Sequence, residues 1–156
     1  MPERRTARVL LFDADDRILL MKGRLPSDPD APGMWFTLGG GVDPDETYEQ
    51  GAAREIVEET GLEKVILGPE VWSAERVLKD RKGRPVLFKE RYFVARCQAA
   101  PLSRAGWQAL EHEFIDDIRW WSVAELRTSS DPIFPPDLPA RLAGALATTP
   151  AGAPQR

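Results

Sequence analysis

Short runs in which apolar and polar residues alternate occur along much of the chain, separated by turn-forming residues. A period of two is typical of strands with one buried face. The run Arg8–Met21 indicates two strands around an Asp-rich turn. Further strands are predicted within Trp35–Gly41, Glu63–Leu78, Arg84–Cys97 and Ile118–Leu126, the last of which continues into a short helix. The turn KDRKG between two of these runs favours a hairpin.

Helical patterns interrupt the strands. Residues Val42–Gly61 indicate a proline-containing turn, then a helix, then a glycine stop, and Pro136–Thr149 indicates a last helix. Interleaved helices and strands predict an α/β (α+β) fold with a mixed sheet. We expect one domain over residues 1–149 and a disordered tail over residues 150–156.

Composition narrows the possible functions. The 156 residues are 42% hydrophobic, yet no apolar run approaches the length of a membrane span, and the N-terminus does not resemble a secretory signal. A single cysteine, Cys97, favours a cytoplasmic location and is expected in a buried strand. The net charge of −4 makes nucleic acid an unlikely partner. One histidine, His112, excludes a multi-histidine metal site.

The helix before Gly61 carries carboxylates where they are electrostatically unfavourable. Glu55, Glu58 and Glu59 fall in its last turns, and the C-terminal end of a helix is partially negative. Helical periodicity places them opposite an apolar stripe, which comprises Ala53, Ile56, Val57 and Thr60. One interpretation is a solvated acidic face. The other is a divalent-cation site, because Mg²⁺ prefers hard oxygen ligands.

The spacing of this segment resembles the signature of the Nudix (MutT-like) hydrolases. The matching positions are Gly40, five residues, Glu46, seven residues, and then Arg54-Glu55-Ile56-Val57-Glu58-Glu59-Thr60-Gly61-Leu62. With the strand order, the resemblance extends over residues 6–128. It implies a Nudix-type α/β/α sandwich that hydrolyses a nucleoside diphosphate linked to another moiety, with water attacking phosphorus.

The resemblance also implies roles for single residues. Glu55, Glu58 and Glu59 would bind Mg²⁺ or Mn²⁺, with the carbonyl of Gly39 as a further ligand, and Arg54 would orient the acidic cluster. The remaining expectations concern supporting residues. Glu46 would support the preceding loop, Gly39, Gly40 and Gly41 would permit a turn at the substrate site, and Ala53, Ile56, Val57 and Leu62 would pack in the core.

The general base stays open at this point. Glu111 is the first candidate from a later acidic loop and Glu113 the second, while a glutamate of the motif, Glu55 or Glu59, is the alternative. Arg76, Lys89 and Arg91 on the predicted hairpin are candidates for phosphate contacts. Trp35, Trp72 and Trp107 are candidates for ring stacking, although tryptophans in strands are more often core residues.

Other functions remain to be separated from hydrolysis. A Nudix-fold isomerase of isoprenyl diphosphates would need an early catalytic cysteine, and Cys97 lies after the motif. A catalytically silent domain that binds nucleotide as a regulator would be expected to lose motif glutamates, which are all present. The expected partner is a small nucleotide-type molecule. Its identity, the number of metal ions and homodimerisation are left open.

Overall fold

The computed structural model describes residues 1–24, 28, 30–80 and 82–150. The strands are β1 (Glu3–Phe12), β2 (Ile18–Gly23), β3 (Met34–Gly41), β4 (Val65–Lys79), β5 (Pro85–Cys97), β6 (Ile115–Trp121) and β7 (Ile133–Phe134). The helices are α1 (Tyr48–Thr60), α2 (Ala109–Phe114), α3 (Val123–Arg127) and α4 (Leu138–Thr148). The predicted strands, the hairpin β4–β5 and the last helix are confirmed.

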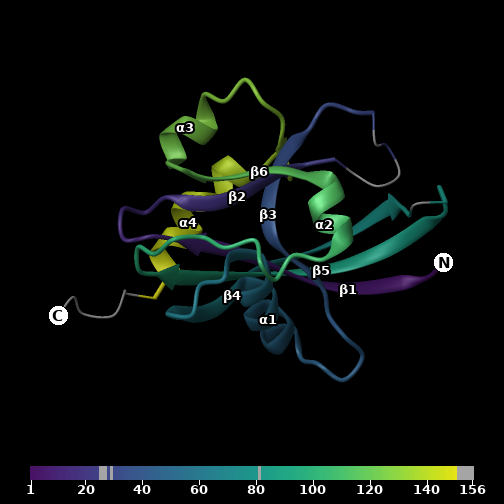
Figure 1. Cartoon of the computed structure of the whole chain (residues 1–156), viewed down its shortest axis with the longest axis horizontal. Coiled ribbons are helices and arrows are strands. Elements are labelled where there is room, and N and C mark those ends of the chain that lie inside the picture. The colour runs from purple at the N-terminus through teal and green to yellow at the C-terminus, as the bar shows by residue number, and fades with distance from the viewer. Residues whose placement is uncertain (25–27, 29, 81, 151–156) are drawn as a thin grey trace.

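The strands form one mixed sheet in the order β4-β5-β1-β2-β3-β7, and β6 pairs with β2. β1 and β5 are parallel, as are β3 and β7, while the other pairs are antiparallel. Alternation in β1 sends Val9 and Leu11 to the side of α1, and Leu10 and Phe12 to the side of α3 and α4. Helices therefore cover both faces (Figure 1), which confirms the predicted α/β fold.

The predicted glycine stop of α1 is confirmed, because Gly61 ends the helix in the left-handed conformation at φ 71°. At the other end, Thr47 caps the N-terminus in a capping box with Gln50. The predicted apolar stripe is wrong in part, because Ala53 is exposed and Val57 is 54% exposed. The buried face is rotated toward the glutamates. It contains Ala52, Glu55, Ile56, Glu59 and Thr60.

The three consecutive glycines form the end of β3 and not the expected turn. They pair with β1, Gly39 opposite Arg8 and Gly40 opposite Ala7. Gly39 has φ 129°, and a Cβ there would lie 2.0 Å from the carbonyl oxygen of Ala7. Glycine is thus required for the close approach of two strands.

The acidic segment before β6, predicted as a loop, contains the helix α2. Gln108 begins it through reciprocal hydrogen bonds with Glu111.

None of the helices in the described part of the chain is long and apolar enough to cross a membrane. The first residue of the predicted tail, Pro150, contacts β5, where its carbonyl accepts a hydrogen bond from Arg96 Nε at 3.1 Å. Residues 151–156 lie outside the described residues.

Candidate active site

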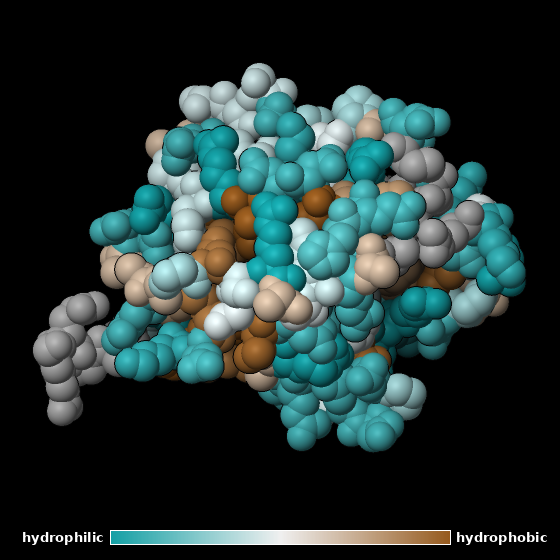
Figure 2. All heavy atoms as spheres, in the orientation of Figure 1, coloured by the Kyte–Doolittle hydropathy of each residue, from teal (hydrophilic) through white to brown (hydrophobic). Residues whose placement is uncertain are grey.

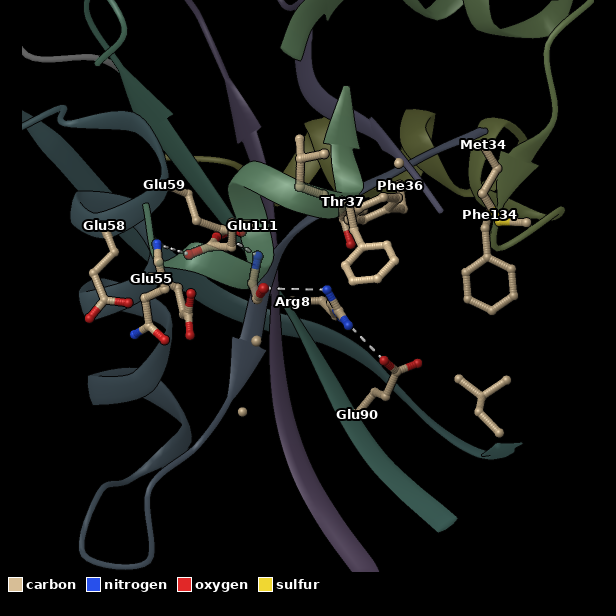
Figure 3. Close-up of a pocket in the computed structure, with 18 of the residues that line it drawn as sticks. Arg8, Met34, Phe36, Thr37, Glu55, Glu58, Glu59, Glu90, Glu111 and Phe134 are labelled. Atoms are coloured by element: carbon tan, nitrogen blue, oxygen red, sulfur yellow. Dashed lines mark hydrogen bonds and ion pairs between the residues drawn. The ribbon is translucent and has the colours of Figure 1, made fainter. Parts of the chain in front are cut away.

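A cavity of about 530 Å³ opens beside the end of β3. One side, here called the acidic wall, carries the carboxylates of Glu55, Glu58, Glu59 and Glu111. The opposite side, here called the aromatic wall, is formed by Met34, Phe36, Tyr92, Phe114 and Phe134. Figure 3 shows the acidic side chains on the left, Phe36, Met34 and Phe134 on the right, and Arg8 between them.

Two glutamates of the acidic wall are buried. Glu59 is 4% exposed and Glu55 is 9% exposed. The Glu59 carboxylate accepts a hydrogen bond from the backbone N–H of Gly39 at 2.7 Å. Glu55 lies so close to β3 that a Cβ on Gly40 would be 2.6 Å from its Oε1. Gly40 therefore allows the Glu55 carboxylate to lie against the strand. The sequence indicated that this glycine permits a turn and did not predict this contact.

The environment opposes ionisation of both side chains. Burial raises the pKa of Glu55 to about 7, and the nearby Glu58 and Glu111 add to this, although Arg54 acts in the opposite direction. Burial, together with Glu55, also raises the pKa of Glu59 well above its usual range. Carboxylates with these environments would be stabilised as anions by a nearby cation.

Arg54 organises the polar side of α1. Its Nε and Nη2 each bind the Glu46 carboxylate at 2.8 Å, and hydrogen bonding to Arg54 lowers the pKa of Glu46 to about 2. Its Nη1 donates to Glu55 at 3.2 Å and to Glu58 at 3.3 Å. Nη2 also reaches the carbonyl of Gly41 at 2.9 Å. One guanidinium thus joins the loop, the strand and two acidic side chains.

The carbonyl groups at the end of α1 receive donors from a distant segment. Ser103 N–H donates to the carbonyl of Thr60 and the indole Nε1 of Trp107 to that of Glu59, each at 2.8 Å. Gly106 allows this contact, because a Cβ there would lie 2.7 Å from the carbonyl oxygen of Glu58. Trp107 is therefore a buried tie between α1 and the segment leading to α2. Sequence reasoning did not identify this role.

The structure separates the two later acids. Glu111 lines the cavity, and its carboxylate also accepts from the N–H of Gln108 at 3.1 Å. Glu113 is exposed and is not among the residues that line this cavity. Only the first candidate for the base is brought to the acidic wall.

The predicted phosphate contacts lie elsewhere. Arg91 stands over the ring of Tyr48 at 4.2 Å and pairs with Glu70, and Lys89 pairs with Glu3. Arg76 binds Glu90 and is likewise not among the lining residues. Sequence reasoning missed the arginines that do line the cavity, which are Arg4, Arg8 and Arg24. Arg4 and Arg8 reach the cavity because β1 pairs with β5 and β3, and Arg24 follows the end of β2.

The tryptophans considered for stacking have other contacts, and none of them is among the residues that line the cavity. Trp35 is buried and donates to Asp131 at 3.0 Å, while Trp72 stacks on Tyr92 with ring centroids 4.7 Å apart. The rings that face the cavity come instead from three phenylalanines and Tyr92. Adjacent residues of β3 face opposite ways, so Phe36 faces the cavity while Trp35 does not.

The acidic wall fits a hard divalent cation by its chemistry. Its donors are carboxylate oxygens and the Gly39 carbonyl, the ligand types that Mg²⁺ and Mn²⁺ prefer. Among the described residues, no three acidic, histidine or cysteine side chains are already arranged as a metal site. Hydrogen bonds hold these carboxylates, Glu59 toward Gly39 and Glu55 and Glu58 toward Arg54. An ion would have to reorient them.

Two relatives share part of this sequence. The CTP pyrophosphohydrolase of Escherichia coli K12 is 37% identical over 71 residues, which are 46% of this chain and 50% of that protein. The RNA pyrophosphohydrolase of Gluconacetobacter diazotrophicus is 36% identical over 72 residues, which are 43% of this chain and 42% of that protein. The chain thus spans half or less of the length of these curated relatives.

Solved structures and a family model extend the similarity. A NUDIX hydrolase from Nitrosomonas europaea has a TM-score of 0.68 at 18% identity, covering 94% of this chain and 89% of that one. The NUDIX domain of Shewanella oneidensis NrtR, complexed with ADP ribose, has a TM-score of 0.66 at 18% identity, covering 94% and 90%. The model described as NUDIX domain matches residues 2–141. The fold, the motif on α1 and this match together show that the chain belongs to the Nudix family.

Proposed function

We propose that the protein is a metal-dependent hydrolase of a diphosphate bond in a nucleoside diphosphate derivative, with water attacking phosphorus. The observation that carries this proposal is the gathering of four carboxylates on one wall of a cavity of about 530 Å³. Membership of the Nudix family and the similarity to two pyrophosphohydrolases support it.

Glu55, Glu58, Glu59 and the Gly39 carbonyl would hold Mg²⁺ or Mn²⁺. When bound, the ion would neutralise phosphate charge and lower the pKa of water. Two of the three carboxylates have raised pKa values because they are buried, so an adjacent dication would stabilise their charged forms. The cost of burying these anions in the free protein is consistent with a site built for a ligand.

The chain's own residues would position the reaction. Arg54 holds Glu55 and Glu58 beside the loop that carries Glu46. Glu111, on α2, would accept the proton of the attacking water, because it is the only acid outside the motif among the acidic-wall residues. The aromatic wall would contact the nucleoside or another ring. Phosphoryl transfer depends mainly on positioning and charge neutralisation, which these two walls would supply.

A nucleotide screen tests the proposal. The purified chain is incubated with Mg²⁺ and a library of nucleoside triphosphates, nucleotide sugars, ADP-ribose, dinucleoside polyphosphates and capped RNA, and released phosphate or monophosphate is measured. We expect turnover of at least one compound, its loss with EDTA, and its loss in Glu59→Gln. The matched control is Glu63→Gln, since Glu63 is exposed just beyond α1. Failure to cleave any compound would reject the hydrolase.

A regulatory domain is the second candidate, favoured by the similarity in fold to the NUDIX domain of NrtR, which was solved with ADP ribose. In that case ADP-ribose would bind without being consumed. Titration calorimetry followed by product analysis of the same sample distinguishes the two functions. The complete set of motif glutamates favours the hydrolase. An isomerase that uses Cys97 is disfavoured, because this cysteine is buried and its thiol pKa is raised to about 11 by burial.

A further inference from the structure

A buried ionic cluster adjoins the cavity on the strand side. Glu90 in β5 is 3% exposed, although it carries a carboxylate. Its Oε2 accepts from Thr6 Oγ1 and Arg8 Nε, each at 3.2 Å, and its Oε1 accepts from Arg76 Nε at 2.7 Å and from Tyr92 Oη at 3.5 Å. The parallel pairing of β1 with β5 brings these groups together, since Thr6 lies opposite Glu90 and Arg8 opposite Tyr92.

The hydrogen-bonding capacity of Glu90, at the centre of the cluster, is satisfied by the protein. Both oxygens of Glu90 already accept two hydrogen bonds, so this carboxylate has little capacity left for a ligand. Burial opposes its ionisation, but Arg8 and Arg76 outweigh burial and lower the pKa of Glu90. A buried ion pair often stabilises a fold no more than apolar side chains of the same volume would. Its position beside the cavity therefore invites a functional explanation.

Arg8 is the arginine of the cluster that lines the cavity, and it has N–H donors to spare. Only its Nε binds Glu90, and its Nη1 makes a long contact of 3.4 Å with the carbonyl of Gly39. Within the described residues, its Nη2 donates no hydrogen bond to the protein. The side chain is 23% exposed and lines the cavity between the acidic and aromatic walls (Figure 3).

Arg76 shares the Nε contact with Glu90 and the exposure of 23%, but its other contacts and its position differ. Its Nε binds Glu90, its Nη2 contacts Tyr92 Oη at 3.5 Å, and its guanidinium lies 5.0 Å from the centre of the Phe134 ring. Unlike Arg8, it is absent from the residues that line the cavity. The same carboxylate therefore holds one arginine behind the cavity and another at its surface.

We propose that Arg8 binds a phosphate group of the substrate, and that Glu90 is a positioning residue that aims the free side of the Arg8 guanidinium into the cavity. A planar guanidinium suits phosphate, because its N–H groups can donate to two oxygens at once. A diphosphate that reaches from the acidic wall toward the aromatic wall would pass Arg8. The ligand class is thus a diphosphate, whatever ring it carries, and this inference rests on the proposed function.

The charges of the residues that line the cavity bear on how an anionic ligand would bind there. Figure 2 shows hydrophilic residues over most of the viewed face, with hydrophobic residues visible between them, mainly left of centre. Acidic side chains outnumber basic ones among the residues that line the cavity. An anionic substrate would therefore be repelled unless a cation occupied the acidic wall and a fixed positive group received the remaining phosphate charge. Arg8 supplies that group.

The test measures binding and kinetics in Arg8→Gln, Arg8→Lys and Glu90→Gln. Methylenediphosphonate serves as a ring-free, non-hydrolysable probe, titrated calorimetrically with and without saturating Mg²⁺. The nucleotide cleaved best in the screen serves for steady-state kinetics. Arg84→Gln is the matched control, because Arg84 is an exposed arginine that pairs with Asp80 at the hairpin.

In Arg8→Gln we expect the Kd for the probe and the KM for the nucleotide to rise about tenfold or more, with a smaller change in kcat, because the contact is made in both the bound and the transition state. Arg8→Lys should recover part of the loss, since charge is kept but the fork is not. Glu90→Gln should raise both constants less. A role confined to folding would instead lower the melting temperature and leave probe affinity unchanged in the folded fraction.

The outcomes separate this inference from the proposed function. Unchanged Kd and KM in Arg8→Gln, with active wild type, would overturn the role of Arg8 and leave the hydrolase intact. Arg8-dependent probe binding without cleavage of any nucleotide would reject the hydrolase and retain the diphosphate site. Absence of probe binding to the wild type under both conditions would overturn the inference. If Arg8→Gln fails to fold, Arg8→Lys decides, and an unchanged Kd in that variant also overturns it.

Discussion

The acidic and aromatic walls of the cavity are assembled in different ways. Three of the four acidic residues come from the last two turns of α1, so a single continuous segment carries most of that wall. The aromatic wall draws two side chains from β3 and one each from β5, α2 and β7. The comparison indicates that the proposed chemistry is encoded locally, whereas ligand recognition depends on how distant segments pack.

The two walls also contribute differently to the free energy of folding. Burial of Glu55 and Glu59 is electrostatically unfavourable in the protein alone, as their raised pKa values indicate. Burial of aromatic surface is favourable and contributes roughly 25 cal/mol per Å² to folding. Substitutions in the acidic wall should therefore affect activity and stability in opposite directions, while substitutions in the aromatic wall should lower both.

The largest effect is expected from Glu59→Gln. It should reduce kcat about 10³-fold at saturating Mg²⁺, because it removes a metal ligand, and it should stabilise the protein in EDTA by roughly 1 kcal/mol or more, because a buried charge is lost. Steady-state kinetics and urea unfolding measure the two effects, with Glu63→Gln as the control. We expect Glu58→Gln to lose activity similarly. Near-normal turnover would contradict the metal assignment.

A loss of about 10²-fold in kcat is expected for Glu111→Gln, with little change in KM, since a general base acts in the transition state. Glu113→Gln is the matched control, because Glu113 lies on the same short helix and is exposed. Rates of both variants are compared over a pH series. If only Glu113→Gln is impaired, the assignment on α2 is wrong. If neither is impaired, a motif glutamate is the base.

A smaller effect, about tenfold in kcat, is expected from Trp107→Phe. The ring is retained, but the hydrogen bond to the Glu59 carbonyl is lost, which leaves a buried acceptor unsatisfied and costs about 1–3 kcal/mol of stability. The loosened tie between α1 and α2 should misplace the carboxylates relative to one another. Trp72→Phe is the comparison, and an equal fall in kcat there would argue against a specific tie.

The smallest effect is expected in the aromatic wall. Phe36→Leu should raise KM about threefold for nucleotides and leave kcat within twofold, because it trims ring contact without touching the acidic wall. Affinity for methylenediphosphonate should not change. A large loss of kcat would contradict the functional separation of the two walls.

Local sequence was sufficient for much of this protein. The alternating runs predicted the strands, Gly61 predicted the end of α1, and the spacing from Gly40 to Leu62 identified the family. These features depend on residues close together in the chain. Short-range hydrogen bonding and backbone preferences determine these features, so they can be predicted without a structure.

Tertiary structure decided the orientation of α1 and the composition of the far wall. Helical period gives the angles between side chains but not which side faces the sheet, and so Val57 was placed in the core although it is exposed. The helix α2, which the sequence did not predict, places Glu111 and not Glu113 among the residues that line the cavity. Arg8 and Glu90 meet only because β1 pairs with β5, 82 residues further along the chain. Such contacts are set by packing of the whole sheet, and no local pattern contains them.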